Sequence, residues 1–96
     1  MGIMVDEGYG GSEQEALAEL RSEGFSAEVK DYAPGRTEPH AHDYEVRLFI
    51  LDGEFRLTDA DSGTVHACPP GARVRVSAGT RHSEAHGALR MVVGRR

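Results

Sequence analysis

The stretch from Glu38 to Phe55 reads EPHAHDYEVRLFILDGEF and contains the strongest structural signals of the chain. Its centre, Glu45–Leu51, ends in the apolar run Leu48–Leu51, which favours a β-strand. Asp52-Gly53 follows as a two-residue hairpin signal, so we expect a return strand over Glu54–Thr58. This stretch therefore predicts a β-rich fold.

Short apolar segments bounded by turn residues continue after this stretch and also precede it. Their alternation of apolar and polar residues predicts strands at Phe25–Tyr32, Thr64–Cys68, Arg73–Val76, His82–His86 and Leu89–Val93. Many short strands at regular spacing, joined by tight turns, are typical of an all-β sandwich or barrel.

The N-terminal part has a different pattern. Residues 12–23 fit a short helix, with Ser12 as the N-cap, Glu15 completing a capping box and Gly24 ending the helix. Residues 1–11 are expected to form a flexible arm, with a short strand at Ile3–Val5. The predicted organisation is an arm over residues 1–11 and a single domain over residues 12–96, with the barrel at about residues 25–94.

Composition excludes several classes of function. The chain has 96 residues and a net charge of −5, without the basic stripe of a nucleic-acid binder. No apolar run approaches the roughly 20 residues of a membrane span. The single cysteine, Cys68, rules out an internal disulfide and fits a reducing cytoplasm. We expect a cytoplasmic protein that binds neither nucleic acid nor membrane.

Histidines are the residues with the clearest chemical meaning. His40 and His42 are two residues apart, so both imidazoles point to one side if the segment is extended. His82 follows a tight glycine turn and could bring a third imidazole from a distant strand. Three imidazoles that converge on one point form a clamp suited to a divalent transition metal.

Two segments carry a family resemblance. Gly35–Gly53, GRTEPHAHDYEVRLFILDG, resembles the first cupin motif, and Gly71–His86, GARVRVSAGTRHSEAH, resembles the second. Only 17 residues separate Gly53 from Gly71, which resembles the spacing in compact microbial cupins. The resemblance implies a small double-stranded β-helix, the jelly-roll barrel of cupins, with one short helix before it. It also implies one metal ion on the three histidines, whether iron, zinc, nickel, manganese or copper.

The sequence departs from the motif at the acidic ligand. The family's glutamate is expected at Val46 or Arg47, but the nearest acid is Glu45. Strand alternation places Glu45 on the face opposite Val46 unless a bulge re-aims it. We therefore favour a three-histidine site, with Glu45 as a candidate fourth ligand. The asparagine that ends the second motif is replaced by His86.

Four further residues are candidates for the pocket, and each also has a purely structural interpretation. Tyr44 could supply a hydroxyl, and Arg47 could bind a substrate carboxylate if it faces inward. Glu84 could support a ligand or act as a general base. His86 is expected to face into the barrel with His82 and Glu84.

Three functions remain open at this point. The favoured one is a metal-dependent enzyme of dioxygenase, isomerase or lyase type, since neutral ligands leave the metal charge free to attract an anionic or carbonyl-bearing molecule. The alternative is a non-catalytic small-ligand sensor, and the third is a metal-free barrel. We also expect a homodimer, because so small a barrel has exposed strand edges.

Overall fold

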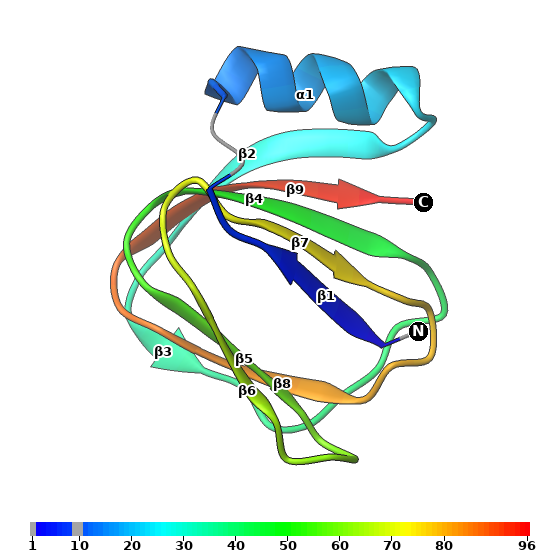
Figure 1. Cartoon of the computed structure of the whole chain (residues 1–96), viewed down its shortest axis with the longest axis vertical. Helices are drawn as coiled ribbons and strands as arrows, with labels where there is room; N and C mark the ends of the chain where they lie inside the picture. Colours follow the sequence, from blue (N-terminus) through cyan, green and yellow to red (C-terminus); the bar gives the residue numbers. More distant parts are fainter. Residues whose placement is uncertain (1, 9–10) are drawn as a thin grey trace.

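The computed structural model describes residues 2–8 and 11–96 and shows two antiparallel β-sheets that face each other, with one helix outside them (Figure 1). The larger sheet has the order β1-β7-β4-β9-β2, formed by Ile3–Asp6, Arg73–Val76, Val46–Asp52, Leu89–Arg95 and Ser26–Tyr32. The smaller sheet has the order β3-β8-β5-β6, formed by Gly35–Arg36, His82–His86, Phe55–Asp59 and Val65–Cys68. This confirms the all-β prediction.

The main core lies between the two sheets. Successive residues of β4 alternate between its faces: Leu48 and Ile50 point to the inner face, which faces the smaller sheet, and Phe49 points to the outer face. From the smaller sheet, Phe55 and Leu57 complete the inner layer. Burying each of these large apolar side chains contributes about 1.5–3 kcal/mol to folding.

Helix α1 (Glu13–Ser22) covers the outer face of the larger sheet (Figure 1). Ser12 caps it as expected, because its side chain accepts a hydrogen bond from the Glu15 amide while the Glu15 carboxylate accepts one from the Ser12 amide. Ala16 and Leu20 lie on one side of the helix and pack in a second buried cluster with Phe25, Phe49 and Val92. The predicted helix is confirmed.

The expected hairpin at Asp52-Gly53 is wrong. Strand β5 pairs with β6 and β8 of the smaller sheet, whereas β4 pairs with β7 and β9 of the larger one. The turn therefore carries the chain from one layer to the other. Gly53 has a φ of +96°, and a Cβ there would collide with the Ala88 carbonyl oxygen, so glycine is required on two counts. A dipeptide signal specifies a reversal of the chain but not the sheet in which the next strand pairs.

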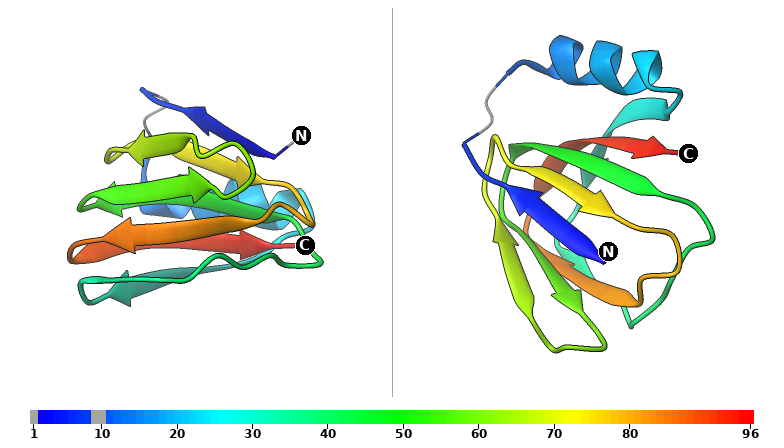
Figure 2. Two further views of the ribbon diagram at one scale, coloured as in Figure 1. Left: turned by 90° about the horizontal axis from the view of Figure 1, so that it is seen from below. Right: turned by 45° about the vertical axis from the view of Figure 1, so that its right-hand side comes forward.

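Part of the expected N-terminal arm is ordered as an edge strand. Residues Ile3–Asp6 form β1 and pair antiparallel with β7, at the edge of the larger sheet in both views of Figure 2. Ile3 and Val5 pack against the core, whereas Met4 points away and is 58% exposed. Met1, Tyr9 and Gly10 of the arm lie outside the described residues. In the described part of the chain, no helix has the length and hydrophobicity of a membrane span.

Candidate metal centre

Backbone hydrogen bonds place the three predicted histidines side by side. His40 and His82 lie opposite each other across an antiparallel bridge, with both amide-to-carbonyl bonds at 2.8 Å. Directly opposed residues of such a pair project their side chains to the same face. The Gly79 amide donates to the His42 carbonyl at 2.7 Å, and the φ of +80° at Gly79 shapes the turn before His82. The glycine turn thus brings distant segments to one point.

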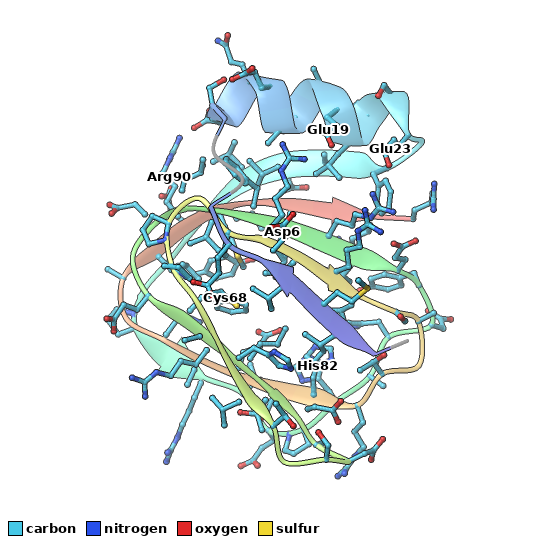
Figure 3. All side chains as sticks on the ribbon, in the orientation of Figure 1. Asp6, Glu19, Glu23, Cys68, His82 and Arg90 are labelled. Atoms are coloured by element: carbon cyan, nitrogen blue, oxygen red, sulfur yellow. The ribbon has the colours of Figure 1, made fainter. Side chains whose placement is uncertain are left out.

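The three imidazoles form one compact cluster on the inside of the barrel. One potential ligand atom from each of His40, His42 and His82 lies within 4.8 Å of the other two. The ring centroids of His40 and His82 are 4.5 Å apart, and those of His40 and His42 are 5.0 Å apart. His82 is 2% exposed and points into the space between the sheets (Figure 3). The structure therefore brings the three histidine side chains together, as the sequence predicted.

The hydrogen bonds of two rings leave the correct nitrogen free for a metal. Nδ1 of His40 lies 2.9 Å from the Glu38 carbonyl oxygen, and Nδ1 of His82 lies 2.9 Å from the Thr80 carbonyl oxygen. A carbonyl only accepts, so Nδ1 donates its proton in both bonds, and Nε2 of the neutral ring keeps a lone pair. Backbone carbonyls commonly orient metal-bound histidines in this way.

His42 has surroundings that favour the neutral ring required for metal binding. Burial lowers its pKa, and the neighbouring imidazoles of His40 and His82 lower it further. A metal ligand must be deprotonated, so a lowered pKa keeps His42 available over a wider pH range. Three neutral imidazoles in this arrangement fit a divalent transition metal, although imidazole ligands do not select among zinc, copper, nickel and iron.

A cavity of about 240 Å³ opens beside the histidines. The three rings occupy part of its wall, and apolar side chains of both sheets form much of the rest, among them Val46, Leu48, Leu57, Val76, Met91 and Val93. This volume lies below the range of about 300–1,000 Å³ that is usual for drug-sized ligands. The cavity can therefore hold a small molecule next to the histidines.

Two of the predicted pocket residues line this cavity. Tyr44 stacks on His42, with ring centroids 4.8 Å apart and an interplanar angle of 19°. Glu84 lies close to two rings: its Oε2 is 3.4 Å from Nε2 of His82 and 3.8 Å from Nε2 of His40. Both residues are thus placed within reach of a molecule bound in the cavity.

Glu45 and Arg47 do not join the cluster. Glu45 accepts hydrogen bonds from Arg47 at 3.0 Å and from Arg96 at 3.1 Å, and Arg47 also pairs with Glu23 at 2.8 Å. These contacts lie on the outer face, where the Arg47 guanidinium sits 4.7 Å from the centroid of the Phe25 ring. The only register shift recorded in β4 is between Ile50 and Asp52, too far along the strand to turn Glu45 inward. Neither side chain is available to the cavity.

His86 also lies apart from the cluster. Its ring packs against Tyr32 and Phe55, with centroid separations of 5.6 Å and 6.3 Å, and its Nδ1 donates to the Gly87 carbonyl at 3.0 Å. It is absent from the cavity wall. The sequence predicted that His86 faces inward with His82 and Glu84. In the structure, His86 lies at the other end of β8 from His82, away from the cavity.

Arg95 is a cavity residue that the sequence analysis missed. It lies near the end of β9, and its positive charge is close enough to contribute to the lowered pKa of His42. The sequence did contain a signal for Arg95: Leu89, Met91 and Val93 alternate along β9, and Arg95 is the next residue in that series. The series faces inward and ends in a cation at the cavity.

Comparison with known structures identifies the fold. A DUF861 family protein from Thermotoga maritima matches with a TM-score of 0.69 and 18% identity over 95% of this chain and 96% of that protein. A cupin-2 domain protein from Shewanella frigidimarina matches with a TM-score of 0.64 and 12% identity over 73% of this chain and 68% of that protein. These similarities confirm the jelly-roll barrel that the sequence motifs predicted.

One similar structure belongs to a named enzyme. The polyketide cyclase RemF from Streptomyces resistomycificus matches with a TM-score of 0.65 and 25% identity over 74% of this chain, which spans 53% of RemF. No protein-family model and no curated protein sequence matches the chain.

Proposed function

The chain is a cupin-fold domain, and from that premise we propose that it binds one divalent transition metal on His40, His42 and His82 and acts on a small molecule held beside them. The observation that carries this proposal is the cluster of three potential ligand atoms within 4.8 Å of one another in the wall of a cavity. The Nδ1–H bonds of His40 and His82 to backbone carbonyls support it, because they direct Nε2 toward the cluster.

The substrate we propose is a small molecule with a carboxylate or a carbonyl group. Arg95 places a permanent positive charge at a cavity that is lined by both polar and apolar side chains. A guanidinium is well suited to bind a carboxylate through two parallel hydrogen bonds. The volume of about 240 Å³ favours a molecule smaller than a typical drug.

The role that we propose for each group follows from its place in the cavity. The three histidines would hold a metal that would supply Lewis-acid polarisation of a carbonyl or carboxylate oxygen. Arg95 holds the anionic end of the molecule, and the Tyr44 hydroxyl donates to or accepts from a polar group beside His42. The apolar side chains of the cavity lower the local dielectric constant around these polar contacts. The reaction is of the isomerase, lyase or dioxygenase type, and the cyclase named among the similar structures supports an enzymatic role.

The experiment that tests this function compares metal-loaded and chelator-treated protein on a panel of small acids, thiols and diketones. Oxygen uptake detects a dioxygenase, and proton exchange on ketones detects an isomerase or lyase. We expect turnover that requires metal and falls when Arg95 is replaced in Arg95→Ala. Metal-dependent binding of a panel member without turnover would instead favour a non-catalytic sensor.

We propose further that the chain forms a homodimer. Strand β1 leaves one of its edges unpaired in the larger sheet, and Met4 on this strand is 58% exposed. An unpaired edge with an apolar side chain favours association with a second copy. Size-exclusion chromatography at micromolar concentration should give a mass near twice the 10.4 kDa of the chain. Elution as a monomer would contradict this expectation.

A further inference from the structure

The position of Glu84 suggests a protein ligand of the metal that the cupin motifs do not supply. Its carboxylate is 25% exposed and lies against the two imidazoles, with Oε2 at 3.4 Å from Nε2 of His82 and 3.8 Å from Nε2 of His40. Among residues 2–8 and 11–96, its ion-pair partners within 4.0 Å are these two histidines. Two hydrogen bonds to Thr37 fix the strand here: the Thr37 amide donates to the Glu84 carbonyl at 2.9 Å, and the Thr37 side-chain Oγ1 accepts from the Glu84 amide at 3.1 Å.

The facing atoms are all electron-pair donors. Because Nδ1 of His40 and of His82 carries the ring proton, each Nε2 presents a lone pair toward the Glu84 carboxylate. Lone pairs that face an anion repel it unless a cation lies between them. An imidazolium–carboxylate hydrogen bond would be about 2.7–2.9 Å long, which is shorter than both contacts.

The distance between Glu84 and His82 fits a shared metal ion. Ligand atoms about 2.1 Å from one ion lie roughly 3.0 Å apart in an octahedral site and roughly 3.4 Å apart in a tetrahedral site. The separation of 3.4 Å between Glu84 Oε2 and His82 Nε2 matches this spacing, and that of 3.8 Å to His40 is slightly longer. Glu45, the acid nearest to the motif position, is instead bonded to Arg47 and Arg96.

We propose that Glu84 is the fourth protein ligand of the metal, so that strand β8 supplies both His82 and the carboxylate. This inference rests on the proposed function, since it requires metal on the three histidines. A carboxylate ligand reduces the net charge of the metal site from +2 to +1. It also favours metals that accept oxygen, such as manganese and iron, over those that prefer only nitrogen or sulfur.

The test measures Co²⁺ and Mn²⁺ affinity of the full chain by competition with a chelator, together with the visible spectrum of the Co²⁺ form. We expect Glu84→Gln to weaken binding by at least about 10–100-fold, to shift the Co²⁺ spectrum, and to weaken Mn²⁺ more than Co²⁺. Glu84→Asp retains the charge but is one methylene shorter, so it should also lose affinity. Glu45→Gln is the matched control and should bind both ions as the wild type does.

The outcomes separate the two proposals. If the wild type binds neither ion, the proposed function and this inference both fail. If the wild type binds but Glu84→Gln keeps its affinity and spectrum, only the inference fails. Full affinity in Glu84→Asp would also overturn it, because charge alone would then account for the role of Glu84. The circular dichroism of the metal-free variants verifies that each one is folded.

Discussion

Polar side chains gather on both sides of the larger sheet, but their arrangements differ. On the outer face, beneath α1, arginines and carboxylates are paired: Arg47 contacts Glu23 and Glu45, and Arg73 contacts Glu19 at 2.6 Å. Figure 3 shows Glu19 and Glu23 on the side of the helix that faces the sheet. On the inner side, three histidines from the smaller sheet and the segment that bridges to it converge in the space between the two sheets. Both faces border a cavity, of about 250 Å³ outside and about 240 Å³ inside.

The two cavities are of similar size, so the arrangement of their polar groups is what distinguishes the two sides. Arg47 and Arg73 on the outer face are paired with carboxylates, which is the pattern of a structural ion-pair network. On the inner side, the imidazoles of His40 and His82 are oriented by backbone carbonyls, which leaves the Nε2 lone pair of each ring free. We therefore expect the outer polar residues to contribute to stability and the inner ones to metal binding, and variants can separate these roles.

The largest effect, on metal affinity, is expected from His42→Ala inside the barrel. Free energies of about 10–16 kcal/mol for four-ligand zinc sites correspond to about 3 kcal/mol per ligand, or roughly 100-fold in affinity. We expect a loss of this size in Zn²⁺ affinity, measured by competition with a chelator. Urea unfolding of the metal-free variant should be close to that of the wild type, because His42 is only partly buried. Unchanged affinity would remove His42 from the site.

A smaller effect, on stability and not on metal affinity, is expected from Arg47→Ala on the outer face. The change removes two ion pairs and the stacking of the guanidinium on Phe25, with a cost of about 1–2 kcal/mol in the free energy of unfolding. Urea unfolding of the metal-free protein measures this cost. Zn²⁺ affinity should remain that of the wild type, and a large loss of affinity would contradict the separation of the two faces.

The smallest effect is expected from Glu45→Gln, and it depends on pH. Burial alone would raise the pKa of Glu45, but the bonds and charges of Arg47 and Arg96 hold it below the ordinary value of 4.5. The stabilisation is thus complete above pH 4.5 and is lost as the pH falls through the lower pKa of the folded state. The carboxylate is partly exposed, so we expect a deficit of about 0.5 kcal/mol at pH 7 that vanishes in acid.

Unfolding curves of Glu45→Gln and the wild type at several pH values test this dependence. A deficit that grows toward low pH would show that the two arginines do not stabilise the ionised carboxylate. A large loss of metal affinity in the same variant would restore Glu45 as a ligand.

Local patterns in the sequence predicted most of the fold because they depend on neighbouring residues. The capping box of Ser12 and Glu15 sets the start of α1, and strand alternation correctly placed Glu45 opposite Val46. The pairing of strands was less accessible, since Asp52-Gly53 indicates a turn without specifying the sheet that receives the next strand. Long-range packing decides that choice.

The candidate site was predicted only in part, because some of its residues depend on local patterns and others on long-range packing. The spacing of His40 and His42, and the glycine turn before His82, are local features that the motifs record. The positions of Arg95 and Glu84 relative to the histidines depend on how β8 and β9 cross the barrel, and that becomes visible only when the two sheets are assembled. Arg47 was a candidate because sequence alone did not fix its partners Glu23 and Glu45.

The most direct test of the central claim is an anomalous diffraction map of crystals of the wild-type protein grown with a divalent transition metal. The account predicts one anomalous peak inside the barrel, about 2.1 Å from a ring nitrogen of each of His40, His42 and His82. A map with no peak at these three histidines, or with its only peak on the outer face beside Glu45, would contradict it.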